Sequence, residues 1–330
     1  MNSSKIDVVV TYVDFNDPQW QKEKAQYDST FEYSEANTEQ RFRTIPFFHH
    51  WFRALEENAP WVNKVFFITY GHVPEWLNLN HPKLRVVKHK EFIPEKYLPT
   101  YNSNVIELNL HRIEDLSERF ILFSDDVFLN SSLRPEDFFI EGRVKDFGIY
   151  EPLVPREEFQ HIELNNVIVI NKYFEPKKTF KKNLFKFFTP AYGKYNMNNF
   201  FALFYKGIFG YKNIHVTLPH LKSTFKEVWE KEESLLDSVC HNRFRSYNDV
   251  NHYLMSNWNI ETNRFVPQNI KIGKYFSFVD VSDVIDSVLN RKDKIICIND
   301  DVNDVEFDQL SEDILIGFDK RYPKKSSFEI

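Results

Sequence analysis

Glycine is scarce in this sequence. Only eight of the 330 residues are glycine, although glycine usually makes up about 7% of a protein. Neither a GxxxxGK[ST] nor a GxGxxG segment occurs, which excludes the common glycine-rich phosphate-binding loops. If the chain binds phosphate, we therefore expect side chains and helix ends to hold it.

The chain also has few cysteines and no long apolar run. Cys240 and Cys297 are too few for the disulfide framework of a small secreted protein or for a four-thiolate zinc site. No segment reaches the roughly 18 apolar residues of a membrane span, and the N-terminal apolar stretch is short and flanked by Asp7 and Asp14, unlike a signal peptide. These features predict a cytoplasmic protein that meets a membrane only peripherally, at its inner face.

The net charge and the length of the chain further limit the classes of protein to which it can belong. A formal net charge of −6 argues against a nucleic-acid partner, because such proteins carry a clustered surplus of Lys and Arg. An apolar content of 42% over 330 residues is typical of a globular protein. One large domain, or one core with a substantial insert, is the expected organisation.

Short β-branched runs alternate with helical patterns in the first half of the chain, which predicts βαβ units. The expected fold is α/β, with a Rossmann-like, mostly parallel sheet flanked by helices. The predicted strands are Ile6–Val13, Val65–Thr69, Leu84–Lys88, Phe120–Phe123 and Lys294–Ile298. The predicted helices cover 46–58, 104–116 and 221–240, one that begins near Asp249, and a last one closed at Pro323.

Residues 171–212 differ in composition from the rest of the chain. Six lysines fall between Lys172 and Lys186 with one acid, Glu175, among many Phe and Tyr residues. Phe180, Leu184, Phe187 and Phe188 have the spacing of an amphipathic helix, so a helical insert is expected. Its lysines either form an ordinary solvated face, or the basic aromatic face receives an anionic polymer or lies against a membrane surface.

Two adjacent carboxylates follow the strand predicted at 120–123. Ligands of open parallel sheets bind outside the carboxyl ends of strands, and hard oxygen ligands such as Asp125 and Asp126 suit Mg²⁺ or Mn²⁺ bridging a diphosphate. Both side chains can reach one ion only if the chain turns there. The alternative is a pair of aspartates that cap a turn or a helix.

A histidine and two arginines are further candidates. His220 is expected at the head of the helix 221–240, where a neutral imidazole can accept a hydroxyl proton near pH 7; His215 competes for this role. Arg243 and Arg245 offer guanidinium groups that match phosphate oxygens. Capping and surface salt bridges are the alternatives for these residues.

Several segments resemble the Stealth family of hexose-1-phosphotransferases, both in their amino-acid sequences and in their order along the chain. The resemblance lies in IDVVVTYVDFNDPQW, in FRALEENAPWVNKVFFITYGHVPEWLNLNHPKLRVVKH with LPTYNSNVIELNLHRIEDLSERFILFSDDVFL, in LPHLKSTFKEVWE with NRFRSYNDV, in KIICINDD, and in the ending YPKKSSFE. It spans most of the chain and leaves mainly residues 141–212 uncovered.

The resemblance implies a catalytic set of Asp125, Asp126, His220 and Arg245, with the two aspartates as metal ligands. Ser124 departs from the Asn of many members, and some members have two histidines closer together than His215 and His220. The matched blocks supply the candidates for substrate binding, namely Asp7, Asp14, Asn102, Ser103, Glu107, Arg112, Arg243, Asn299 and Asp300.

The expected activity is transfer of a sugar 1-phosphate from a UDP-hexose or UDP-N-acetylhexosamine to a carbohydrate hydroxyl, with Mg²⁺ or Mn²⁺ and with release of UMP. Residues 1–140 would bind the nucleotide sugar, 141–212 would form the variable insert, and 213–330 would supply the catalytic helices and a closing strand. The alternatives are a metal-dependent glycosyltransferase that releases UDP and a non-catalytic carbohydrate-binding or scaffold subunit.

Overall fold

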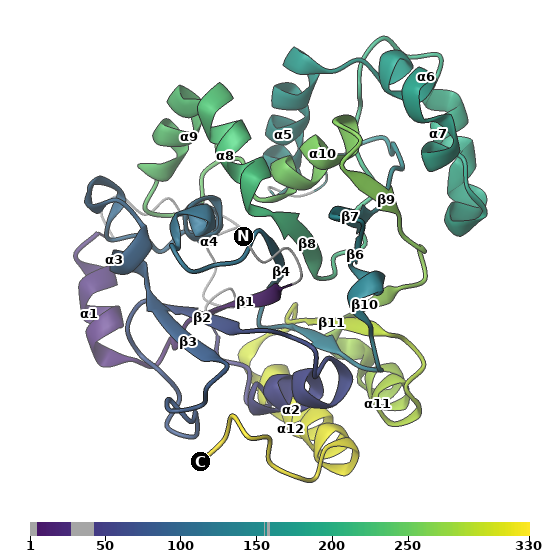
Figure 1. The fold of residues 1–330 in the computed structure, drawn as a ribbon. Helices are drawn as coiled ribbons and strands as arrows, with labels where there is room; N and C mark the ends of the chain where they lie inside the picture. The colour runs from purple at the N-terminus through teal and green to yellow at the C-terminus, as the bar shows by residue number, and fades with distance from the viewer. Residues whose placement is uncertain (1–4, 28–42, 155, 157–158) are drawn as a thin grey trace.

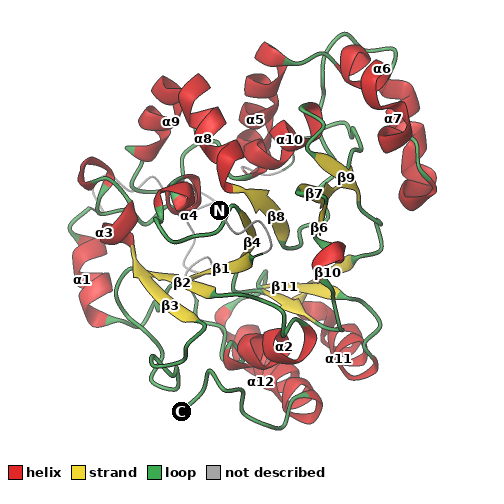
Figure 2. Cartoon of the chain, in the orientation of Figure 1, coloured by secondary structure: helices red, strands yellow, loops and turns green. Residues whose placement is uncertain are grey.

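The computed structural model describes residues 5–27, 43–154, 156 and 159–330. Two sheets lie in the middle of the molecule, with α2, α11 and α12 on one side and α4, α8, α9 and α10 on the other (Figures 1 and 2). This arrangement confirms the predicted α/β fold with a mostly parallel sheet.

The larger sheet has five strands in the order β3-β2-β1-β4-β8. Its first four strands are parallel, and β8 is antiparallel to β4. The carboxyl ends of β1, β2 and β4 therefore meet at one edge, together with the amino end of β8. The strands are β1 (Ile6–Tyr12), β2 (Val65–Thr69), β3 (Leu84–Lys88), β4 (Arg119–Phe123) and β8 (Leu218–Leu221).

A second sheet of three strands, in the order β10-β11-β5, was not expected from the sequence. Its strands are β10 (Gly273–Ser277), β11 (Ile295–Asn299) and β5 (Val127–Leu129). The chain passes from β4 in the first sheet to β5 in the second through a turn at Asp125 and Asp126. A third small sheet joins β6 (Phe139–Ile140), β7 (Arg143–Asp146) and β9 (Phe265–Pro267).

The helices cover both faces of these sheets. The α-helices outside the insert are α1 (Pro18–Ala25), α2 (His49–Asn58), α3 (His89–Phe92), α4 (Ser103–Leu108), α8 (Lys222–Lys231), α9 (Glu233–Cys240), α10 (Tyr253–Glu261), α11 (Val281–Asn290) and α12 (Asp304–Arg321). Single turns of 3₁₀-helix occur at η4 (Glu95–Tyr97), η5 (Leu110–Arg112), η6 (Pro135–Asp137) and η8 (Phe278–Asp280). None of the helices in the described ranges has both the length and the apolar character that crossing a bilayer needs.

The segment between β7 and β8 is helical, as predicted. It contains α5 (Phe159–Tyr173), α6 (Pro176–Phe187), η7 (Pro190–Tyr195) and α7 (Asn196–Ala202), and α6 and α7 lie side by side at one corner of the molecule (Figure 1). Its two ends are paired: Tyr150 forms a β-bridge with Tyr211, and the N–H of Glu151 donates to the C=O of Gly210 at 3.1 Å. We call this pairing the clasp.

The central strands are buried because helices cover both of their faces. All five residues of β2 are buried, and Val9 and Val10 of β1 are completely enclosed. Continuous apolar runs of this kind are what central parallel strands require. The sequence pattern is therefore sufficient to locate β1, β2 and β4.

Three helix predictions were wrong in extent. The predicted helix 104–116 ends at Leu108, because the side-chain amide of Asn109 donates to the C=O of Val105 at 2.8 Å and the chain continues as a 3₁₀ turn. The predicted helix 221–240 breaks at Glu232 (φ −124°, ψ 33°), whose carboxylate binds Lys172 and Tyr173 of α5. Asp249 is not a helix cap, since α10 begins at Tyr253.

Candidate active site

The predicted carboxylate pair lies in the turn between the two sheets. The N–H of Ile298 on β11 donates to the C=O of Asp126 at 2.9 Å, so the turn is held against the end of β11. Burial, followed by the neighbouring charge of Asp126, raises the pKa of Asp125 to about 7. Such a rise is expected where two carboxylates share a poorly solvated site.

Asp14 lies beside this turn, beyond the end of β1. Val10 of β1 is paired with Phe123 of the parallel strand β4, so the chain reaches Asp14 and Asp125 beyond the same end of the two strands. Burial, and then the charges of Asp14 and Asp125, raise the pKa of Tyr12. The N–H of Asp14 donates to His72 Nε2 at 2.8 Å, and the hydroxyl of Thr44 donates to Asp14 Oδ1 at 3.3 Å. The structure thus brings Asp14 to the edge that carries Asp125.

His220 lies inside the sheet. It belongs to β8, is paired with Phe120 of β4, and is completely buried. Its Nε2 lies 3.2 Å from Nδ1 of His252, whereas its Nδ1 has no hydrogen-bond partner. Burial and then His252 lower the pKa of His220 well below 6.5, so the ring is neutral at pH 7. His220 precedes α8 as predicted, but it does not face solvent.

His252 extends this contact toward the arginine. Its Nε2 lies 3.9 Å from the carboxylate of Glu107 on α4, and the side chains of His252 and Glu107 are 15% and 12% exposed. Burial raises the pKa of Glu107 to about 7, while the charge of Arg245 opposes that rise. Arg245 donates to the hydroxyl of Ser103 at 2.8 Å.

A buried network fixes the loop that carries Arg245. The carboxylate of Asp249 accepts hydrogen bonds from the amides of Asn102 (2.8 Å), Asn104 (3.0 Å) and Asn242 (2.8 Å) and from the N–H of Ser246 (3.1 Å). Asn102 is completely buried. Asn102 lies next to Ser103 at the start of α4, and its contacts are those of a residue that positions the loop of Arg245.

Asp126, His215 and Cys297 form a second cluster at the same edge. One ligand atom from each residue lies within 4.8 Å of the others. The charge of His215 also lowers the pKa of His252, to about 3, after the larger effect of burial. His215 therefore lies beside Asp126, and its charge acts on His252.

Three predicted substrate-binding residues, Asn299, Asp300 and Arg243, have partners of their own. Asn299 ends β11, opposite Ser277 of β10. Asp300 forms a salt bridge with Arg43 at 3.1 Å. The guanidinium of Arg243 lies 4.5 Å from the centre of the Tyr27 ring.

Two other predicted residues are not brought to the site by their contacts. Asp7 is completely buried near the start of β1, where its carboxylate accepts from the amide of Asn63 (2.6 Å) and the N–H of Ser117 (2.8 Å). Arg112 donates to Asn109 at 2.8 Å and lies 4.6 Å from the centre of the Trp229 ring. Their contacts are those of residues that stabilise the fold.

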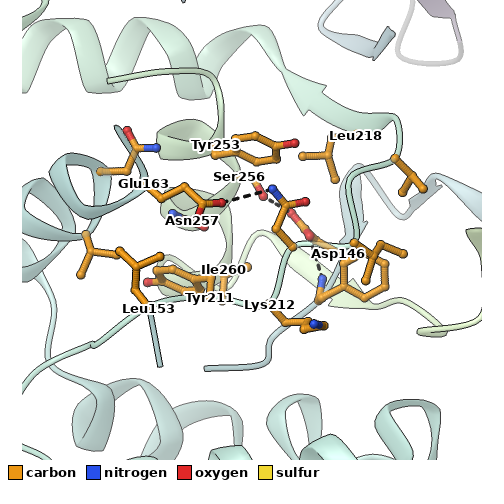
Figure 3. Close-up of a pocket in the computed structure, with 17 residues that line it drawn as sticks. Asp146, Leu153, Glu163, Tyr211, Lys212, Leu218, Tyr253, Ser256, Asn257 and Ile260 are labelled. Carbon is orange, nitrogen blue, oxygen red and sulfur yellow. Dashed lines mark hydrogen bonds between the residues drawn. The ribbon is translucent and has the colours of Figure 1, made fainter. Parts of the chain in front are cut away.

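A narrow cavity lies behind the loop of His215, between that loop, α5 and α10. Its volume is about 30 Å³, which is enough for a water molecule but not for a hexose. Figure 3 shows Glu163, Tyr253 and Asp146 around it, and the amide of Asn213 donates to Glu163 at 3.4 Å. The residues around this cavity hold the loop of His215 in place and do not form a substrate pocket.

Reasoning from the sequence missed His252 and Cys297. His252 follows the block NRFRSYNDV by two residues, so its spacing from Arg245 was the available signal. Cys297 stands within KIICINDD, but a lone cysteine in an apolar strand gives no signal of its own. Only the pairing of β11 with β5 brings it to Asp126.

Among solved structures, the galactosyltransferase LgtC in complex with donor and acceptor sugar analogs is similar to this chain. The identity is 11%, the TM-score is 0.38, and the match covers 93% of this chain and 95% of that one. A likeness at this level carries no argument about the reaction.

The sequence comparisons are much closer. The capsular polysaccharide phosphotransferase WcwK of Streptococcus pneumoniae is 51% identical over 327 residues and covers 99% of each chain. The exopolysaccharide phosphotransferase cps2G of Lactiplantibacillus plantarum is 36% identical over 98% of this chain and 96% of its own. The receptor polysaccharide phosphotransferase WefC of Streptococcus oralis is 36% identical over 99% of this chain and 100% of its own.

Residues 41–147 match the family described as Stealth protein CR2, conserved region 2. These comparisons confirm the family that the sequence motifs indicated, and they argue against the alternative of a non-catalytic subunit. The chain belongs to the Stealth family and is a phosphotransferase enzyme.

Proposed function

We propose that this chain transfers a hexose 1-phosphate or an N-acetylhexosamine 1-phosphate from its UDP-activated donor to a hydroxyl group of a carbohydrate acceptor. The product is a phosphodiester linkage of a capsular or other surface polysaccharide, as the names of the relatives suggest. The observation that carries the proposal is a set of neighbouring polar groups: Asp126 lies beside His215, and His252 lies 3.9 Å from Glu107, while the charges of His215 and Arg245 act on His252 and Glu107. It joins carboxylates, imidazoles and a guanidinium from distant parts of the chain.

In the proposed reaction the acceptor oxygen attacks the phosphorus next to the sugar. The bond from this phosphorus to the bridging oxygen of the diphosphate breaks, and UMP leaves with that oxygen. The sugar keeps its phosphate, and the hydroxyl proton passes to a base on the enzyme. Each of these steps needs a group that the edge described above provides.

We assign the proton transfer to the pair His220–His252. His220 is completely buried, so His252 is the ring that meets the acceptor hydroxyl. When His252 Nδ1 carries the hydrogen shared with His220, the Nε2 of His252 is free to accept a proton. His220 thus acts through His252 by fixing its tautomer, which is the task of the third member of a catalytic triad.

Arg245 is the proposed clamp for the transferred phosphate. Its guanidinium stays charged and matches phosphate oxygens. Ser103 and the network around Asp249 hold the loop in place. Glu107 lies 3.9 Å from the neutral ring of His252, and the charge of Arg245 acts on its carboxyl group.

Asp125 and Asp126 are the proposed ligands of Mg²⁺ or Mn²⁺. Asp126 Oδ1 is buried without a hydrogen-bond partner, and an oxygen donor of this kind fits a hard cation. When bound, such an ion neutralises charge on the diphosphate and on the leaving UMP. Asp14, Asn299 and Asp300 border the space proposed for the nucleotide sugar, so residues 1–140 and 213–330 share the site.

The released nucleotide tests the proposal. The chain is incubated with a panel of UDP-sugars, an acceptor oligosaccharide and Mg²⁺ or Mn²⁺, and the products are separated by anion-exchange chromatography. Release of UMP in step with acceptor phosphorylation supports phosphotransfer. Release of UDP would mean attack at the anomeric carbon, as in a glycosyltransferase, and would refute the proposed reaction.

We further propose that the insert holds the enzyme at a membrane surface. Between Pro176 and Lys206 the sequence has seven lysines and neither Asp nor Glu. The same stretch exposes large apolar side chains, with Phe185 88% and Phe204 70% exposed, and also Leu184, Met197, Phe200, Phe201 and Tyr205. Exposed aromatic rings beside lysines match an anionic lipid interface, where each lysine contributes about 1 kcal/mol.

Sedimentation with vesicles tests this surface. The chain should bind vesicles of phosphatidylglycerol with phosphatidylcholine and not vesicles of phosphatidylcholine alone. Phe185→Ser with Phe204→Ser should weaken binding at least 10-fold, whereas Val305→Ser, at an equally exposed residue on α12, should leave it unchanged. Binding to a soluble anionic polysaccharide without binding to vesicles would instead make this face an acceptor site and overturn the proposal.

A further inference from the structure

The cluster of Asp126, His215 and Cys297 combines three kinds of ligand atom. A carboxylate oxygen, an imidazole nitrogen and a sulfur lie within 4.8 Å of one another. The Sγ of Cys297 is 3.4 Å from Asp126 Oδ2. The three residues come from the turn after β4, from the loop before β8 and from the middle of β11, so the fold, and not local sequence, assembles them.

The surrounding structure holds each of the three residues in place. Cys297 is completely buried and paired with Val127 across the second sheet. His215 has a left-handed backbone (φ 51°), which is costly for a residue other than glycine. Its N–H donates to the side-chain oxygen of Asn213 at 2.8 Å, and Asn213 is itself bonded to Glu163. A strained residue held by this support indicates a position selected for its side chain.

The carboxylate of Asp126 is incompletely satisfied. Its Oδ2 faces the weakly polar thiol of Cys297, and its Oδ1 is buried without a hydrogen-bond partner. A buried carboxylate oxygen without a donor costs free energy that a bound cation would recover. Asp125 is not part of this cluster.

We propose that His215 and Cys297 bind the divalent ion of this enzyme together with Asp126, so that they take the place given to Asp125 above, and that this set favours Mn²⁺, Co²⁺ or Zn²⁺ over Mg²⁺. The inference rests on the proposed function, because it specifies the ligands of the ion invoked there. Mg²⁺ prefers six oxygen ligands, whereas imidazole nitrogen and sulfur select softer ions. Binding converts the Cys297 thiol to a thiolate and releases one proton to solvent.

Cobalt provides a direct test, because a Co²⁺–thiolate bond absorbs in the near ultraviolet. Co²⁺ alone is titrated into the full chain, without a nucleotide sugar, and the absorption spectrum is recorded. The wild type should show the sulfur-to-cobalt band, and Cys297→Ser should lose it. Cys240→Ser, at the other buried cysteine, should keep the band. A band that is absent from the wild type, or that survives in Cys297→Ser, would overturn the proposal.

The affinity for Mn²⁺ gives a second measurement that does not depend on the cysteine. His215→Asn should raise the dissociation constant for Mn²⁺ at least 10-fold, as expected for the loss of one ligand. Asn tolerates a left-handed backbone, so this variant should keep the fold. His49→Ala is the matched control, because His49 belongs to the other described cluster of potential ligands, with His50 and Asp319. An unchanged dissociation constant in His215→Asn would refute the ligand set.

The two measurements separate this inference from the proposed reaction. A cobalt band that depends on Cys297, in an enzyme that releases UDP, would keep the ion site and reject phosphotransfer. Release of UMP supported equally by Mg²⁺ in the wild type, in Cys297→Ser and in His215→Asn would keep phosphotransfer and reject the ligand set.

Discussion

The network around Asp249 allows a quantitative prediction. Asp249→Ala removes the acceptor of four hydrogen bonds. The buried amide of Asn104 then faces a cavity, and that of Asn102 keeps only its bonds to backbone C=O groups, such as that of Phe244 at 3.1 Å. A hydrogen bond to a charged group is worth about 1.5–3 kcal/mol. Asn242 is only partly buried and regains water, so the two buried amides decide the loss. We expect Asp249→Ala to lower the free energy of unfolding by about 3–5 kcal/mol.

Urea titrations followed by tryptophan fluorescence measure this loss, and UMP release is assayed where the variant is still folded. Activity should fall further than the folded fraction, because the loop of Arg245 loses its anchor. Asp249→Asn keeps one oxygen and should lose less. Asp115→Ala is the surface control, since its pair with Lys64 is about 40% exposed and worth at most about 1 kcal/mol. An Asp249→Ala variant as stable as this control would refute the role of the network.

Three further predictions concern pH, the clasp and the base. The pKa of Glu107 rises from 4.5 to about 7 on folding, so the stability that Glu107 contributes is present at acid pH and is lost as the pH rises through 7. Between pH 4 and 8, urea titrations of Glu107→Gln should show roughly 3 kcal/mol less loss of unfolding free energy than the wild type. An equal loss in both proteins would contradict the raised pKa. Gly210→Ala places a Cβ 2.3 Å from a backbone oxygen at φ 149° and should lower the melting temperature, whereas Gly71→Ala, with open space around it, should not. His252→Ala should reduce kcat at least 100-fold, while His220→Gln should lose less and shift the pH profile; the reverse order would assign the base to His220.

The sequence was sufficient to predict four of the five strands of the larger sheet and β11, because apolar β-branched runs encode buried strands directly, but it did not predict β5 to β10. It did not predict the break at Glu232, since KEESLL contains neither glycine nor proline and the break depends on contacts with α5. The role of Asp249 also depends on contacts that the sequence does not show. It resembles a helix cap in the sequence, but in the structure its carboxylate accepts hydrogen bonds from the amides of Asn102, Asn104 and Asn242.

For the site, the sequence motifs singled out Asp125 and Asp126, which the structure places in the turn after β4, and Arg245, which the structure places beside Ser103 at the start of α4. They did not distinguish His220, which is enclosed, from His252, which is not, because burial depends on how β8 packs against β4. Motif resemblance finds the chemistry of a site better than it finds the accessibility of each side chain.

The clasp has a consequence for how such enzymes diversify. Because Tyr150 and Tyr211 lie side by side, the chain leaves and rejoins the core at one place, although α5 and α6 between them also pack on α10 and β9. Recombination at these two positions would exchange the whole insert as a cassette without altering the strand order of either central sheet. The proposed membrane surface and the proposed reaction would then be able to evolve along separate routes, as long as the contacts of α5 with α10 are kept.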